Sequence, residues 1–410
     1  MALNQGNRRW PAGVLLLALA AVYVWIGRRP PRSTAGSDQQ PAAVAAPEAA
    51  PALATLTPPS PAEVSNASAA PAVSAPPIAE TVPAVPPPEP ALRFSFPTDN
   101  QFLTTSQPER FFMFVDRYLP TGLVEVWQGG SYGFVRNPRE TLQGTVFTKF
   151  HEGIDIAPIL RDAKGEPQDE VRAIADGVVG YVTANSSSSN YGNYIVVLHQ
   201  VGEAGVFYSL YAHLRSTDKM AGAQVTRGDR LGMLGYTGAG IDRRRAHVHL
   251  EIGLILSERF DVFYGGAKGL ANGHGNFHGS NLLGFNGADF LTANRADPQL
   301  MPQDFLAREE VYYKVLVPNR GHELEIVQRH AWLRRPGPAA AAWEISFTGP
   351  GVPVAVAPAA QAVTFATVSW VKTFAGYHSW NTRSLLGGSG STATLSGEGN
   401  KFITLVAGDF

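Results

Sequence analysis

The chain contains no cysteine among its 410 residues. This absence excludes disulfide bonds, zinc sites built from thiolates, a cysteine nucleophile and a lipidated N-terminal cysteine. The chain also lacks an excess of either charge, because 33 basic residues stand against 34 acidic ones. Its composition therefore gives no indication of a nucleic-acid partner. What remains is the composition of a globular protein that is long enough for about two to three domains.

Aromatic residues are missing between Pro30 and Pro90, where Ala, Pro, Ser and Val dominate. A segment of this composition cannot bury enough apolar surface to offset the entropy that folding would cost it. We therefore predict a disordered linker over residues 28–91. Proline-rich linkers are semi-extended at about 3 Å per residue, so this one would hold a folded domain far from its point of attachment.

Charged residues are also missing from 10–27, WPAGVLLLALAAVYVWIG, whereas arginines stand on both sides of this apolar run. A membrane span needs about 20 such residues and the core of a cleavable signal peptide only about 7–15. We predict a short tail over 1–9 and a transmembrane signal anchor over 10–27. The alternative is a cleaved signal peptide and a secreted protein. The flanking arginines do not settle the orientation, because slightly more of them follow the run than precede it.

Folded structure is expected from about Leu92 onward. Short β-branched runs separated by glycine turns predict an all-β fold with an antiparallel sheet, since no crossover helices lie between them. These runs are 171–182, 193–200, 206–214 and 224–238. A first domain over 92–256 would be followed by an extension of unknown role over 257–340 and a small β-rich module over 341–410. Short helices are expected near 109–118 and 303–313.

Two stretches carry polar residues in a spacing that suits metal binding. In a strand, side chains alternate between faces, so His247, His249 and Glu251 would share one face while the residues between them face a core. Imidazole is a common zinc ligand, and bound metal would offset the cost of burying these groups. His151 and Asp155 stand four residues apart around a glycine and would also share a face.

Taken together, these motifs resemble the lysostaphin-type, LytM-like zinc endopeptidases that cut peptidoglycan. Four motifs occur in the order that the family shows. They are HEGID (151–155), ADGVVGYV (175–182), LYAHL (210–214) and HVHLE (247–251). A glycine-rich stretch, GDRLGMLGYTG (228–238), precedes the last of them, as in the family.

The resemblance implies a role for five residues. His151, Asp155 and His249 match the three metal ligands of the family, and His213 and His247 match its two catalytic histidines that are not ligands. Three protein ligands leave the fourth position on zinc open, as a catalytic site requires. The resemblance implies a zinc endopeptidase acting on peptidoglycan stem peptides or cross-links. Because an anchored, cysteine-free chain with a Pro/Ala linker suits a Gram-negative periplasm, D-Ala to diaminopimelate cross-links are the first expectation for the bond that is cut. Such an enzyme would be anchored in the inner membrane with its bulk in the periplasm. The alternative is a non-catalytic peptidoglycan binder or amidase activator on the same fold. The oligomeric state stays open.

Other polar residues near these motifs allow two interpretations. Glu251 could support His249 from behind or face solvent, and the loop Arg243–Arg245 could bind a carboxylate of the substrate or simply be solvated. His199 is interpreted as structural. His274 and His278 have a spacing that suits a metal, but their glycine-rich surroundings favour a loop.

Overall fold

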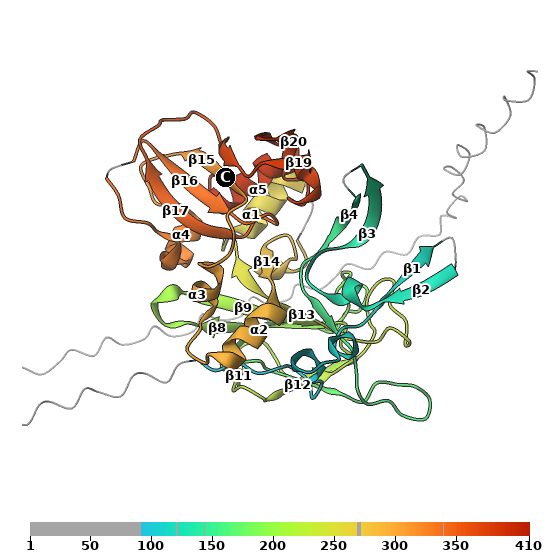
Figure 1. Ribbon diagram of the computed structural model, residues 1–410. Helices are drawn as coiled ribbons and strands as arrows, with labels where there is room; N and C mark the ends of the chain where they lie inside the picture. Colours follow the sequence, from blue (N-terminus) through green and yellow to red (C-terminus); the bar gives the residue numbers. More distant parts are fainter. Residues whose placement is uncertain (1–91, 120–121, 143, 269–271, 339) are drawn as a thin grey trace, which may run out of the picture. The chain divides into compact units, whose positions relative to one another are not determined.

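A computed structural model describes residues 92–119, 122–142, 144–268, 272–338 and 340–410. The tail, anchor and linker expected over 1–91 lie outside these residues. Within them the chain is mostly β-structure, and its sheets are antiparallel, as predicted (Figure 1). In this described part of the chain, no helix has both the length and the apolar character that a bilayer span requires.

The central sheet has seven strands and contains most of the predicted runs. Its strand order is β11-β7-β8-β9-β13-β14, and β5 pairs with β13 on the same side as β14. The strands are β5 (Ile154–Ile156), β7 (Gly177–Thr183), β8 (Tyr194–Gln200), β9 (Val206–Ala212), β11 (Gln224–Val225), β13 (Val248–Ile255) and β14 (Leu282–Phe285).

Strand β13 lies inside this sheet and is buried along its whole length. Its side chains alternate as predicted. Val248 and Leu250 pack in the main hydrophobic core, whereas Tyr208, Leu210 and other residues form a second cluster. Leu210 stands opposite Glu251 in the β9–β13 register, so the second cluster and the polar residues of β13 share one face of the sheet.

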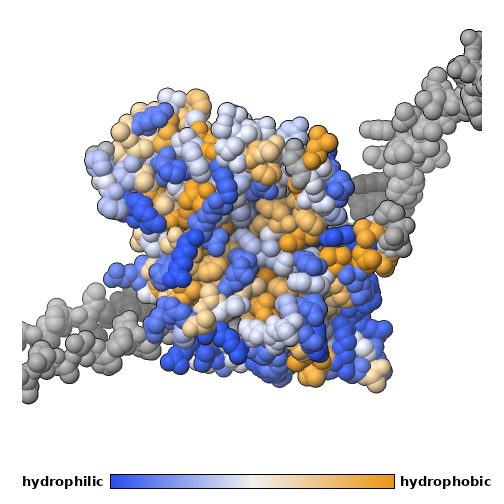
Figure 2. All heavy atoms as spheres, in the orientation of Figure 1, coloured by the Kyte–Doolittle hydropathy of each residue, from blue (hydrophilic) through white to orange (hydrophobic). Residues whose placement is uncertain are grey.

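Two hairpins and a small sheet complete the N-terminal half. The hairpins are β1 (Val115–Leu119) with β2 (Gly122–Val126), and β3 (Gly133–Thr141) with β4 (Gly144–His151). The small sheet consists of β6 (Glu170–Arg172), β10 (Ser216–Thr217) and β12 (Arg230–Met233). Hydrophobic side chains gather near the end of the β1–β2 hairpin (Figure 2), where Leu119 and Leu123 are exposed.

The C-terminal half adds two further sheets. One has the order β17-β16-β15-β18 and the other β19-β20-β21. Their strands are β15 (Tyr313–Pro318), β16 (Ala342–Phe347), β17 (Pro353–Ala359), β18 (Thr367–Val371), β19 (Phe374–Tyr377), β20 (Leu386–Gly390) and β21 (Thr392–Leu395). Residues on both sides of the boundary expected at 340 thus share one sheet, since β15 pairs with β16 and β18. Likewise β14, beyond residue 256, pairs with β13.

Among the residues that the structure describes, the α-helices are few and short. They are α1 (Phe260–Lys268), α2 (Gly287–Ala296), α3 (Pro302–Leu306), α4 (Glu325–Arg329) and α5 (Gly397–Ala407). The helix expected over 303–313 ends at Leu306, and β15 begins at Tyr313. The helix expected near 109–118 is wrong, because a single 3-10 turn at Pro108–Arg110 is followed by β1. There the pairing of β1 with β2 overrides the local helix preference.

Candidate metal centre

The five residues singled out by the motifs come together at one place on the central sheet. His151 is the last residue of β4, and Asp155 lies in β5 directly opposite His249 of β13. His213 follows the last residue of β9, and His247 precedes the first residue of β13. All five side chains are buried, with exposed fractions between 2% and 7%.

The glycine of the HEGID motif allows this approach. A Cβ atom on Gly153 would lie 2.5 Å from the carbonyl oxygen of Leu250 and 2.9 Å from the His249 ring. Only a residue without a side chain can therefore pass so close to β13. The motif thus needs glycine at this position in order to bring His151 and Asp155 against the strand that carries His249.

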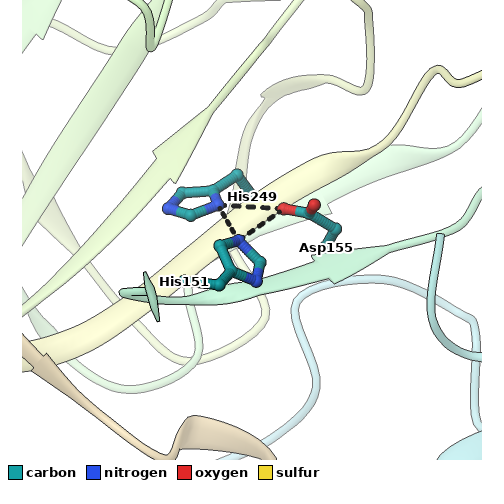
Figure 3. A group of neighbouring side chains, drawn as sticks. All are labelled: His151, Asp155 and His249. Atoms are coloured by element: carbon teal, nitrogen blue, oxygen red, sulfur yellow. Dashed lines mark hydrogen bonds and ion pairs between the residues drawn. The ribbon is translucent and has the colours of Figure 1, made fainter. Parts of the chain in front are cut away.

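Three donor atoms form a small triangle (Figure 3). His151 Nε2 lies 3.1 Å from His249 Nδ1 and 3.1 Å from Asp155 Oδ1, and His249 Nδ1 lies 2.9 Å from the same oxygen. These three residues are a group of the described chain that could hold a metal ion. Ligand atoms around a tetrahedral zinc ion lie about 3.3 Å apart, because each bond is about 2.0–2.1 Å long. The donor set therefore fits zinc in both chemistry and spacing.

Each histidine is fixed through its other ring nitrogen. His151 Nδ1 donates to the Ser131 carbonyl at 2.8 Å, and His247 Nδ1 donates to the Arg245 carbonyl at 2.6 Å. His213 Nδ1 donates to the Thr237 carbonyl at 2.9 Å. A proton held on Nδ1 in a neutral imidazole leaves Nε2 with a free lone pair, which is what a metal ligand or a base requires.

His249 is held the opposite way round. Its Nε2 lies 3.0 Å from Glu251 Oε1, so its Nδ1 points toward Asp155 and His151. Glu251 is 1% exposed, and it also accepts hydrogen bonds from the hydroxyls of Tyr191 at 2.6 Å and Tyr208 at 2.7 Å. Burial, together with the neighbouring Glu251, raises the pKa of both tyrosines well above its usual value, so both donate. The open question about Glu251 is settled, since it lies behind His249 and away from solvent.

Burial and charge set the protonation of the centre. Burial lowers the pKa of His151. Burial, with the neighbouring His247 and His249, lowers the pKa of His213 well below its usual value. Burial opposes the charged form of Asp155, but the neighbouring His151 and His247 outweigh it and hold this pKa well below its usual range. The metal-free centre therefore contains a carboxylate and two neutral imidazoles.

His249 differs from these two histidines. Burial disfavours its charged form, but the hydrogen bonds to Asp155 and Glu251 outweigh burial and raise its pKa to about 10. A proton on Nδ1 therefore occupies the position that a cation would take. Metal binding here would displace that proton.

The structure separates the other candidates from this centre. His199 is buried on β8, with Nδ1 2.8 Å from the Asp176 carbonyl and Nε2 2.7 Å from Ser209 Oγ, as a structural histidine should be. His274 Nδ1 lies within 3.0 Å of the Tyr181 and Tyr194 hydroxyls, in a loop as expected.

The Arg243–Arg245 loop binds groups of the protein itself. Arg244 pairs with Asp116 and Glu125 of the β1–β2 hairpin, and Arg243 pairs with Glu166. Arg245 Nε donates to the Phe114 carbonyl. The loop therefore joins β1–β2 to the segment that leads into His247.

Sequence reasoning missed three residues of the centre, namely Tyr191, Tyr208 and Arg136. Tyr208 stands on a predicted strand and Tyr191 in a serine-rich loop, so neither position indicates a role. Arg136 Nη2 donates to Asp155 Oδ2 at 2.6 Å. A pattern could have indicated a buried partner for Asp155, but not which of the many arginines it would be.

Comparisons with known proteins agree with the motifs. Residues 149–259 match the model of Peptidase family M23. A crystal structure of a putative M23 peptidase from Pseudomonas aeruginosa shares 28% identity over 25% of this chain and 37% of its own, with a TM-score of 0.20. One of a putative glycyl-glycine endopeptidase lytM from Ruminococcus gnavus shares 31% identity over 25% of this chain and 39% of its own, with a TM-score of 0.21.

The catalytic domain of lysostaphin from Staphylococcus simulans shares 19% identity over 40% of this chain and 89% of its own, with a TM-score of 0.24. The chain thus spans less than two fifths of the length of the first two structures. No curated protein matches it. The family match covers all four motifs and begins two residues before the HEGID motif. It confirms the predicted resemblance of residues 149–259 to Peptidase family M23.

Proposed function

We propose that this protein is a zinc-dependent endopeptidase that hydrolyses peptide bonds in peptidoglycan stem peptides or cross-links. The observation that carries the proposal is the triangle of His151, Asp155 and His249 donor atoms, 2.9–3.1 Å apart, within a region of a peptidase family. Zinc held there would supply a Lewis acid for the scissile carbonyl and lower the pKa of water to about 7.

His213 and His247 are proposed to move the protons of the reaction. Hydrolysis of a peptide bond needs a base that takes a proton from water and an acid that returns a proton to the leaving amine. The rings of His213 and His247 lie 4.8 Å apart, and that of His213 lies 5.8 Å from His249. Both hold a proton on Nδ1 toward a carbonyl, so both have Nε2 available as a base. The order in which the two act stays open.

His247 stands closest to the ligand set. Its Nε2 lies 3.3 Å from Asp155 Oδ1, the oxygen that also faces His151 and His249. Distance alone therefore does not separate His247 from the ligands. The family resemblance favours its role as a catalytic histidine, and metal analysis of variants tests that assignment directly.

The left-handed backbone of His213 supports a functional role. Its φ of 63° is one of four positive values among the non-glycine residues of the described chain. A histidine in this conformation carries a backbone cost, and such residues persist where surrounding contacts fix them. Here the His213 N–H donates to the Tyr191 carbonyl and its carbonyl accepts from the Thr237 N–H.

For the bond that is cut, we propose D-Ala to diaminopimelate cross-links, as suggested by the apolar run at 10–27 and the proline-rich segment that follows it. These segments are proposed to anchor the chain in the inner membrane and to extend the peptidase into the periplasm. Secretion after signal cleavage is the alternative, and the mass of the mature chain separates the two.

The test is digestion of purified peptidoglycan sacculi by the full-length chain, with mass spectrometry of the products. We expect new peptide termini at one type of bond, loss of activity with a chelator, and recovery with zinc. A chain that binds zinc, releases no muropeptides and instead stimulates an amidase would contradict the proposal. That result would favour the regulator.

A further inference from the structure

Arg136 contacts a candidate metal ligand directly but is not itself one of the candidate ligands. It lies on β3, where the register with β4 shifts between Phe134 and Arg136. Its Nη2 donates to Asp155 Oδ2 at 2.6 Å, and its Nε donates to the Gly129 carbonyl at 2.8 Å. The Arg136 side chain is 22% exposed, and that of Asp155 is 4% exposed.

The two oxygens of Asp155 have separate partners. Oδ1 faces His151 Nε2 and His249 Nδ1, at 3.1 and 2.9 Å, whereas Oδ2 is taken by Arg136. A carboxylate whose second oxygen is bound by a guanidinium cannot rotate freely to offer both oxygens to one cation. Arg136 therefore selects which oxygen of Asp155 points at the donor triangle.

Arg136 is itself held by the frame that holds Asp155. The Met113 N–H donates to the Asp155 carbonyl at 2.7 Å. The same short segment packs against Gly129 and Gly130, where a Cβ on Gly130 would lie 2.2 Å from the Met113 carbonyl oxygen. The two acceptors of Arg136, the Gly129 carbonyl and the Asp155 carboxylate, thus belong to backbone segments that both contact Met113. A guanidinium with two fixed hydrogen bonds loses less freedom per bond than a flexible ammonium would.

We propose that Arg136 is a positioning residue that sets the affinity of the centre for zinc by fixing Asp155 with one oxygen toward the metal. The inference rests on the proposed zinc site. Residues that orient a ligand from behind typically change metal affinity by about 10–100-fold when they are replaced. An opposing effect exists, because a guanidinium also repels a dication. Loss of positioning would weaken zinc binding by an Arg136 variant, whereas loss of the repulsion would strengthen it.

The experiment measures the zinc dissociation constant of the full-length chain by competition with a chromophoric chelator. For Arg136→Gln we expect zinc binding weaker by about 10–100-fold. Arg136→Lys should restore only part of the loss, since lysine keeps the charge but cannot make the two bonds of the guanidinium. Arg139→Gln is the matched control, because Arg139 is an exposed arginine of the same strand whose contact is with the Trp380 ring. Its zinc affinity should equal that of the wild type.

Chemical rescue separates positioning from folding. Free guanidinium added to Arg136→Ala should tighten zinc binding, whereas the same concentration of ammonium should not, and the metal-free melting temperature reports folding independently. Equal zinc affinity in the wild type and Arg136→Gln, or tighter binding by the variant, would overturn the inference and leave the proposed function intact. Failure of the wild type to bind zinc would overturn both.

Discussion

Two kinds of buried histidine occur in this protein, and the comparison between them shows what makes a site. His199 is 1% exposed, and its two ring nitrogens form hydrogen bonds with the Asp176 carbonyl and Ser209 Oγ. Neither nitrogen is therefore left for a ligand. His151 and His249 are also buried, at 2% and 5% exposed. Each uses one ring nitrogen for a hydrogen bond within the fold and directs the other toward Asp155. A buried imidazole that the fold satisfies completely is structural. Buried imidazoles whose remaining nitrogens converge on one carboxylate form a binding centre.

Removing the converging donors should have the largest effect. Alanine at His151, Asp155 or His249 should abolish stoichiometric zinc binding, because two donors cannot replace a three-ligand site. Elemental analysis of the purified full-length chain should give about one zinc for the wild type and for His199→Gln. Full zinc in all three alanine variants would show that these residues are not the ligands.

Removing a proton-transfer group should have the next largest effect. His213→Ala and His247→Ala should retain zinc while kcat on peptidoglycan falls by about 10²–10⁴-fold, with a smaller change in KM. The double variant should lose far less than the product of the single losses, since both groups serve one transition state. Loss of zinc from His247→Ala would make it a ligand, and near-native turnover would make either histidine structural.

Glu251 makes the comparison sharper, because it decides which nitrogen of His249 faces inward. Glu251→Gln keeps the shape of the side chain but removes the charge beside His249. It also replaces one of the two oxygens that accept from Tyr191 and Tyr208 with an NH2 donor. Zinc affinity should fall by about 10-fold, at the lower end of the range for residues behind a ligand. Tyr208→Phe, which leaves Glu251 and Tyr191 in place, is the control and should change the affinity less. Unchanged affinity in Glu251→Gln would show that the carboxylate acts only in packing.

These residues also show how far sequence reasoning reaches. Alternation along a strand predicted that His247 and His249 share a face. The family resemblance, rather than spacing, indicated that His151 and Asp155 join them, and the structure brings all four together although His151 and Asp155 lie on separate strands. Arg136 and Tyr191 reach the centre through a bulged hairpin and a loop, whose geometry depends on contacts across the fold. The antiparallel sheet was predictable from short β-branched runs separated by glycine turns. The pairing of β15 with β18 was not, because a pairing between distant strands leaves no local pattern.

Replacing His199, the structural histidine, should change the stability of the protein and its pH dependence but not its zinc binding. Burial lowers the pKa of His199 to about 4. Below about pH 6.5 the unfolded chain therefore binds a proton that the folded protein does not bind until about pH 4. The contribution of His199 to stability is complete above pH 6.5 and is lost as the pH falls toward 4, by about 3 kcal/mol in all. Denaturant unfolding of the chelated protein at pH 7 and pH 4.5 should show a smaller pH dependence in His199→Gln. An equal pH dependence in both proteins would contradict the assignment.

Substitutions in the Arg243–Arg245 loop should have the smallest effect on stability and activity. Like the metal centre, this loop brings several charged groups together, but its groups are exposed. Arg243 and Arg244 already pair with Glu166, Asp116 and Glu125, and both are exposed. Exposed ion pairs contribute little to stability, so Arg244→Ser should leave the melting temperature nearly unchanged. A substrate carboxylate would have to displace these internal partners. Replacing all three arginines with serine should therefore change KM equally for acidic muropeptides and for neutral peptides. A rise in KM confined to the acidic substrates would show that the loop exchanges its internal carboxylates for those of the substrate.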